Sequence, residues 1–208
     1  MPDMEERIVL GDDGVQRCRW GSSTPEYRGY HDTEWGFPVS DDVRLFEKLS
    51  LEGFQSGLSW LTILRKREAF RRAFAGFDCQ RIASFGESDI ARLLADASIV
   101  RHRGKIEAVI NNAQRMLELL ETDGSLAAYV WRFEPPARER PNGQEPIRAL
   151  TPESQAMAND LKKRGWRFVG PTTAYAFMQA MGLVNDHAAG CDAGNAVDRA
   201  RKRFTIPT

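Results

Sequence analysis

The stretch "SDDVRLFEKL", residues 40–49, has the pattern of a helix that starts and then turns one face inward. Ser40 is a preferred N-cap residue, and the two aspartates after it place negative charge where the helix dipole favours it. Apolar side chains then recur at helical spacing, at Val43, Leu45, Phe46 and Leu49. The pattern predicts an amphipathic helix that begins close to residue 40.

Helical spacing recurs along most of the chain, whereas the period-two alternation of strands is nearly absent. Thr151 and Pro152 form a further helix start, and Gly165 a helix end. Other helices are predicted around 61–67, over 87–96 and over 104–120. The sequence therefore predicts an all-α fold.

Three segments interrupt this pattern. Residues 1–15 are acidic and contain two glycines, so a loose tail is expected there, and the segment 134–152 contains five prolines, which predicts a long loop. The basic run near the C-terminus predicts a solvated tail over 193–208. Residues 16–192 are then expected to form one domain.

Composition limits the function classes. The 208 residues include 29 basic and 29 acidic side chains, so a wholesale polyanion-binding surface is not implied. No apolar stretch is long enough to span a membrane, and the acidic start is unlike a targeting peptide. An odd count of three cysteines argues against a disulfide framework. A cytoplasmic monomer is expected.

Four cysteine and histidine residues form a candidate metal site: Cys18, His31, His187 and Cys191. If the last two lie on a helix, their spacing of four places both on one face. Two thiolates and two imidazoles suit a tetrahedral, structural zinc ion. By spacing alone, however, a His-x-x-x-Cys pair is more often two ordinary residues, and the separation of the first two matches no standard zinc finger.

Glu52 falls on the apolar face that runs from Leu45 through Leu49 to Trp60. It is either a buried acceptor for a cationic or hydrogen-bonding ligand, or a glutamate that pairs with an arginine or becomes exposed where Gly53 breaks the helix. Aromatic residues are concentrated nearby in the sequence, and each is by default a core residue. Together their ring faces suit a flat cation: Trp20, Tyr27, Tyr30, Trp35 and Trp60.

The segment 162–182 predicts two helices joined by a short turn that contains Gly170. Free backbone N–H groups at the start of the second helix, close to Thr172, would suit a nucleic-acid phosphate. Lys162 and Lys163 add positive charge, and Arg101 and Arg103 form a similar basic turn. Helix pairs of this kind are common, so the motif alone is weak evidence for DNA binding.

Six motifs occur together in this chain: "RCRW" (17–20), "YHDTEWG" (30–36), "LEGFQSGLSWLTILRKRE" (51–68), "IVRHRGKI" (99–106), "LKKRGWRFVG" (161–170) and "GLVNDHAAGC" (182–191). Their order and spacing resemble the type I 3-methyladenine DNA glycosylases, within the helix-hairpin-helix glycosylase superfamily. The resemblance covers residues 17–191, nearly the whole chain.

The resemblance implies a structural zinc ion on Cys18, His31, His187 and Cys191. It implies a lesion pocket formed by Glu52, Trp20, Tyr30 and Trp60, with Trp35 and Tyr27 in its wall. It also implies a DNA-binding hairpin at 168–172. We further expect Leu58, in the turn-prone "QSGL", to wedge the duplex open, the alternative being an ordinary core leucine.

The chain departs from the wider superfamily at Asn185, where other members carry a catalytic aspartate two residues before the histidine; Asp186 lies one step nearer. An asparagine cannot act as a general base. The resemblance supplies a reason, since 3-methyladenine in DNA is already cationic and leaves readily. A monofunctional glycosylase is expected, which acts on double-stranded alkylated DNA and yields free 3-methyladenine and an abasic site. The alternatives are a non-catalytic zinc-stabilised DNA-binding protein and a metal-dependent hydrolase.

Overall fold

The computed structural model describes residues 7–142 and 148–208, and in these ranges the protein is mostly helical. Two short strands, β1 (Ile8–Leu10) and β2 (Gln16–Cys18), pair antiparallel. The α-helices are α1 (Pro25–Thr33), α2 (Asp42–Gln55), α3 (Trp60–Ala73), α4 (Cys79–Ala83), α5 (Glu87–Ala95), α6 (Arg103–Asp123), α7 (Leu126–Trp131), α8 (Pro152–Lys163), α9 (Pro171–Ala180) and α10 (Asp192–Arg203). Short 3-10 helices η1 (Arg19–Ser22) and η2 (Ala75–Phe77) complete the described part. The predicted helical class is confirmed.

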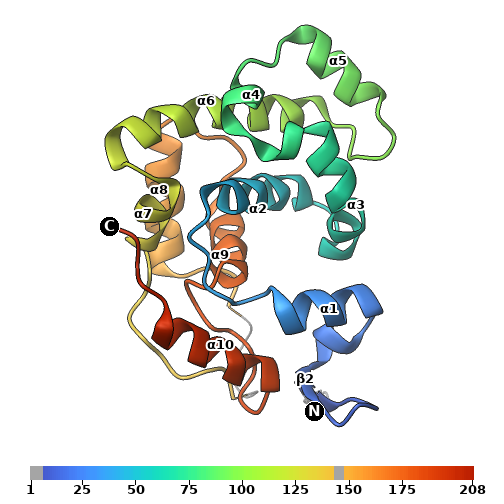
Figure 1. Cartoon of the computed structure of the whole chain (residues 1–208), viewed down its shortest axis with the longest axis vertical. Coiled ribbons are helices and arrows are strands. Elements are labelled where there is room, and N and C mark those ends of the chain that lie inside the picture. Colours follow the sequence, from blue (N-terminus) through green and yellow to red (C-terminus); the bar gives the residue numbers. More distant parts are fainter. Residues whose placement is uncertain (1–6, 143–147) are drawn as a thin grey trace.

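Helix α2 is the centre of the molecule, and Figure 1 shows it between α3 to α6 at one end of the long axis and α1 and α10 at the other. It starts one residue later than predicted, because Asp41 is its N-cap and accepts from the Arg44 backbone N–H at 2.8 Å. Its face bearing Leu45, Leu49 and Phe54 is buried in the core. Helix α9 packs against both α2 and α8.

Both predicted tails contain ordered structure. The strands of the N-terminal hairpin include residues expected to be loose, and the Gln16 backbone N–H donates to Asp192 of α10 at 2.8 Å. Residues 193–203 belong to α10, whose Val197 is fully buried, so the predicted C-terminal tail is wrong there. The two strands were missed because each has only three residues, and α10 was missed because its basic last turn resembles a solvated tail. Residues 1–6 lie outside the described part.

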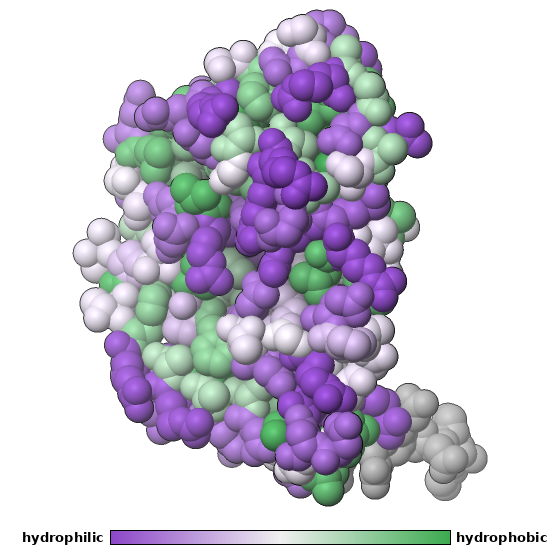
Figure 2. Space-filling view, turned by 45° about the vertical axis from the view of Figure 1, so that its right-hand side comes forward, coloured by the Kyte–Doolittle hydropathy of each residue, from purple (hydrophilic) through white to green (hydrophobic). Residues whose placement is uncertain are grey.

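The predicted proline-rich loop is present over 134–142 and 148–150, which contain no helix or strand, while 143–147 lie outside the described part. Exposed large apolar side chains are scattered on the surface, among them Leu58 and Phe168. The face drawn in Figure 2 mixes hydrophilic and hydrophobic residues in the same way. None of the helices in the described ranges is both long and apolar enough to cross a bilayer.

Candidate functional site: a Cys/His cluster beside an aromatic pocket

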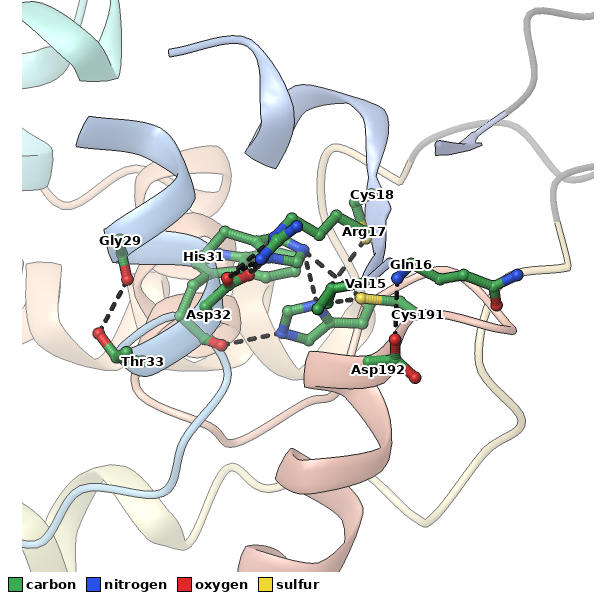
Figure 3. Close-up of polar contacts among 12 residues, drawn as sticks. Val15, Gln16, Arg17, Cys18, Gly29, His31, Asp32, Thr33, Cys191 and Asp192 are labelled. Carbon is green, nitrogen blue, oxygen red and sulfur yellow. Dashed lines mark hydrogen bonds and ion pairs between the residues drawn. The ribbon is translucent and has the colours of Figure 1, made fainter. Parts of the chain in front are cut away.

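The four predicted metal ligands meet in one buried cluster. Cys18 ends β2, His31 lies in α1, and His187 and Cys191 lie just before α10. All four are buried, and one ligand atom from each lies within 4.8 Å of all the others. Figure 3 shows His31 and the two cysteines pointing toward one another from the two ends of the chain.

The spacing of the ligand atoms fits a tetrahedral metal site. Metal–sulfur bonds of ~2.3 Å and metal–nitrogen bonds of ~2.0 Å give tetrahedral edges of about 3.5 Å from S to N and about 3.3 Å from N to N. His187 Nδ1 lies 3.7 Å from Cys18 Sγ, 3.4 Å from Cys191 Sγ and 3.2 Å from His31 Nε2. Cys191 Sγ lies 3.5 Å from His31 Nε2. These four distances match a tetrahedral shell, so the group could hold a metal ion.

The outer nitrogens of both imidazoles have fixed partners, which leaves the inner nitrogens free for a metal. His31 Nδ1 lies 2.7 Å from Asp32 Oδ1, and His187 Nε2 lies 2.9 Å from the Trp35 carbonyl oxygen. Asp32 is in turn held by Arg17 at 2.9 Å. Partners of this kind set the tautomer and orientation of metal-binding histidines.

The cysteines are equally well placed. The Ala188 backbone N–H donates to Cys18 Sγ at 3.3 Å. A hydrogen bond from Cys18, which outweighs burial and acts together with both imidazoles, lowers the pKa of Cys191 well below its ordinary value. The low pKa of Cys191 favours its thiolate, the form that binds metals, whereas the hydrogen bond to Cys191 and burial raise the pKa of Cys18.

His187 and Cys191 do not lie on a helix. Residues 185–191 form a loop, and α10 starts at Asp192. The loop is fixed by Asn185, whose amide donates to the Gly194 carbonyl at 3.0 Å and to Asp198 at 2.7 Å. The two ligands converge through this loop and not through a shared helix face.

Close packing around the cluster requires a glycine in η1. A Cβ atom at Gly21 would lie 2.4 Å from Cγ of His31, a distance that real side chains essentially never show. Gly21→Ala would therefore force the His31 ring out of its position.

Glu52 is buried near the end of α2, with 5 % of its surface exposed. It pairs with Lys48 one turn earlier, with Nζ to Oε1 at 2.6 Å. The Lys48 ammonium also donates to the Tyr30 hydroxyl at 2.9 Å. The helix continues through Gly53, so the alternatives of an arginine pair or exposure at a helix break are both wrong.

The five predicted aromatic residues form one network of ring contacts, and two of them, Tyr30 and Trp60, contact the Lys48 ammonium that pairs with Glu52. Tyr30 and Trp60 have ring centroids 5.5 Å apart, and Trp20 lies 6.4 Å from Tyr30. Trp20 also contacts Tyr27 and Trp35 edge-on, at 5.5 and 5.0 Å. The structure thus brings together one carboxylate and a set of ring faces.

We call the five aromatic residues and the Lys48–Glu52 pair the aromatic pocket. This pocket adjoins the Cys/His cluster. Trp20 lies 5.1 Å from His31, and Trp35 lies 4.6 Å from His187, measured between ring centroids. A small cavity of about 30 Å³ is lined by Tyr30, Lys48 and Trp60, together with Leu51, Met181 and a set of ion-paired side chains. This volume suits one or two waters and is too small for a purine.

Neither residue at the position of the superfamily aspartate is free. Asn185 holds the loop described above. The carboxylate of Asp186 accepts from the Tyr175 hydroxyl and from Arg138, both at 2.5 Å, and from Gln179 at 2.8 Å. Three donors on one mostly buried carboxylate indicate a structural role for Asp186.

The turn between α8 and α9 is held by two asparagines of α6. Asn112 donates to the Arg167 carbonyl at 2.9 Å and accepts from its N–H at 2.8 Å, and Asn111 donates to the Gly165 carbonyl at 2.9 Å. Phe168 is exposed at this turn with a left-handed φ of 55°. The sequence analysis placed Phe168 at the start of the hairpin 168–172 but assigned it no role of its own.

The predicted DNA-binding residues lie mainly on the surface. Lys162 and Lys163 are exposed in the last turn of α8, Gly170 is the N-cap of α9, and Thr172 is exposed in its first turn. Leu58 is 39 % exposed, so the alternative of a core leucine is wrong.

The two arginines of the second basic turn differ in their contacts. Arg101 is exposed. Arg103 pairs with Glu87 at 2.9 Å and with Glu107 at 3.2 Å, so its charge is largely neutralised.

Comparisons with known proteins agree with this arrangement. A family model described as methyladenine glycosylase matches residues 20–194. The chain is 47 % identical over 180 residues to DNA-3-methyladenine glycosylase 1 of Escherichia coli K12, covering 85 % of this chain and 96 % of that protein. A DNA-3-methyladenine glycosylase of Haemophilus influenzae is 42 % identical over 178 residues, covering 84 % and 96 %.

Solved structures show the same likeness. A crystal structure of 3-methyladenine DNA glycosylase I superposes with a TM-score of 0.81 at 50 % identity, covering 85 % of this chain and 98 % of that one. A Staphylococcus aureus 3-methyladenine DNA glycosylase I, studied for its recognition of 3-methyladenine, gives a TM-score of 0.81 at 35 % identity, covering 86 % and 96 %. The chain belongs to the methyladenine glycosylase family.

Proposed function

We propose that the protein hydrolyses the N-glycosidic bond of 3-methyladenine in alkylated DNA and releases the free base, leaving an abasic site. The observation that carries this proposal is the buried Glu52 carboxylate beside the ring faces of Tyr30 and Trp60. A carboxylate with aromatic faces selects a flat cation. The names of the two bacterial relatives state this same base, and both relatives are similar to this chain over most of its length.

The chemistry needs little help from a general acid or base. N3-methylation gives the adenine in DNA a positive charge, and the base becomes neutral as the bond to C1′ breaks. The base must first leave the duplex to reach a buried carboxylate. Water then attacks C1′. This route agrees with Asp186 being occupied by three donors and Asn185 being used in the loop.

Monofunctional hydrolysis is part of the proposal. A strand-cleaving glycosylase attacks C1′ with an amine. Lys48 lies in the pocket, but its ammonium is on the side of Glu52 and Tyr30, which would recognise the base and not the sugar, so we do not assign it as a nucleophile. We therefore expect no Schiff base and no strand cleavage.

A structural zinc ion on Cys18, His31, His187 and Cys191 is also proposed, on the fit of the ligand distances. Four protein ligands close a tetrahedral shell and leave no place for a catalytic water. This argues against the alternative of a metal-dependent hydrolase. When bound, the ion would supply a cross-link between β2, α1 and the loop before α10.

For the DNA contact we propose a helix-hairpin-helix formed by α8, the turn and α9. The N-terminus of α9 offers backbone N–H groups to a phosphate, and Lys162 and Lys163 lie on the exposed side of α8. Leu58 and Phe168 are exposed apolar side chains suited to contact unstacked bases. Double-stranded DNA, a monomeric state and a cytoplasmic location belong to this proposal.

The direct test is incubation of the zinc-loaded protein with methylated duplex DNA. We expect free 3-methyladenine in the supernatant, and strand breaks at the abasic sites only after alkali treatment. Unmethylated duplex is the control and should release no base. A folded protein that releases none would support the alternative of a non-catalytic DNA-binding protein, and breaks without alkali would contradict a monofunctional enzyme.

Replacing both Lys162 and Lys163 with alanine should weaken binding to all duplexes alike. If each contacts one phosphate, the slope of log affinity against log salt should fall by about 1.8, since each contact contributes about 0.9. Lys202→Ala is the matched control, because Lys202 is also an exposed lysine in the last turn of a helix. An equal loss in the control would show that the effect is general charge and not the hairpin.

A further inference from the structure

Lys48 is a buried cation in the aromatic pocket. Its side chain is 7 % exposed, and its ammonium lies 2.6 Å from Glu52 Oε1 and 2.9 Å from the Tyr30 hydroxyl. The same ammonium lies only 3.3 Å from the ring centroid of Trp60. Burial lowers the pKa of Lys48, and the charge of Glu52 opposes that shift. The contacts are a carboxylate, a hydroxyl and a ring face.

These are the partners that a cationic base would require. A positively charged purine stacks on an aromatic face and donates its amino group to a carboxylate. At 3.3 Å the ammonium occupies one face of Trp60, so a base cannot stack on that face until the ammonium moves. The adjoining cavity of about 30 Å³ offers no alternative room.

Two arginines near Lys48 pair with carboxylates other than Glu52. Arg67 is bound to Glu34 at 2.6 and 2.9 Å, and Arg71 is bound to Glu47 at 2.8 Å. Each arginine therefore has its own carboxylate. Lys48 is the counter-ion of Glu52, and its flexible stem is the part of the pocket that can move most easily.

We propose that Lys48 is an internal competitor of the substrate: its ammonium fills the empty pocket and must leave Trp60 and Glu52 before the cationic base binds. The proposal rests on the function proposed above. Every base then has to displace an ammonium, so a base that interacts weakly with Glu52, such as neutral adenine, does not occupy the pocket. Lys48 is a specificity-determining residue and takes no part in bond cleavage.

The test compares wild type with Lys48→Met, which keeps the length of the side chain and removes the charge. The probe is the 3,9-dimethyladeninium cation, in which a methyl group stands for the sugar, and binding is measured by calorimetry. We expect Lys48→Met to bind the probe about tenfold tighter or more, since a desolvated cation–π contact no longer has to be broken. Equal or weaker binding would show that Lys48 only supports Glu52.

Lys105→Met is the matched control. Lys105 is also buried, but its ammonium donates to the Phe54 and Ser56 carbonyls at 2.9 and 2.6 Å. Loss of the Lys105 ammonium should destabilise the fold without tightening the binding of the probe. Tighter binding in both variants would assign the gain to general loosening and overturn the proposal.

A crystal structure of the wild type with the probe tests the same idea if Lys48→Met does not fold. Displacement of Nζ beyond about 6 Å from the Trp60 centroid, the limit of a cation–π contact, is expected. An ammonium still on that ring face would overturn the proposal. Wild-type protein that excises 3-methyladenine but fails these tests refutes the role of Lys48 alone, whereas failure of excision refutes the proposed function.

Discussion

Cys191→Ala is expected to abolish metal binding and to lower the melting temperature by about 8–16 °C. An ion present at about a thousand times its dissociation constant stabilises the folded state by about 4 kcal/mol, and each kcal/mol corresponds to about 2–4 °C in a chain of this size. Cys191 is fully buried and lies within 3.5 Å of both histidine nitrogens. Metal analysis and thermal unfolding measure the two effects.

Cys79→Ala is the control for the same chemical change. Cys79 is a free, partly buried cysteine at the start of α4, away from the cluster. It should retain about one zinc ion per chain and lose much less stability. Similar melting temperatures for the two variants, or a wild type without metal after growth in zinc, would contradict the proposed structural ion.

Glu52→Ala should cause the largest loss at the pocket. The substitution leaves the Lys48 ammonium buried without its carboxylate, which is expected to cost about 3–5 kcal/mol in the free energy of unfolding. The rate of 3-methyladenine release should fall by about 10²- to 10³-fold, the usual cost of removing one preorganised electrostatic group. Urea unfolding and single-turnover release measure the two losses separately.

One further double variant separates the effect on stability from the effect on function. Glu52→Gln combined with Lys48→Met removes both charges at nearly constant volume, so most of the stability should return. Release of 3-methyladenine should stay low because the acceptor charge is absent. Binding to undamaged duplex should be unchanged throughout, and an equal loss of duplex binding would contradict a role confined to the pocket.

The sequence predicted the helices whose starts and apolar faces are local. Asp41 caps the start of α2 and Thr151 caps the start of α8, each within one residue of the predicted start. Gly165, which has a positive φ, follows the end of α8, where the sequence predicts a helix end. It did not predict the β1–β2 hairpin, whose strands have three residues each, or α10, whose basic last turn resembles a solvated tail. It also did not predict that the two elements meet, through the Gln16–Asp192 bond across 176 positions. Local periodicity carries no information about such contacts.

The site was predicted in part. Resemblance, and not spacing, selected Cys18 and His31 as partners of His187 and Cys191, and the structure brings all four together. Lys48 was not singled out, since a lysine four residues before a glutamate is an ordinary pattern on a helix surface. Only the packing of Tyr30 and Trp60 over α2 shows that this pair is buried.

The separation of the four ligands along the chain has a consequence for biosynthesis. Cys18 and His187 lie 169 positions apart, so the ribosome releases the first ligands long before the last. Until then Cys18 and His31 offer at most two donors, too few for a closed tetrahedral shell. Loading of the proposed ion would therefore be a late step, which follows synthesis of nearly the whole chain, and a product that ends before Cys191 could not complete the site.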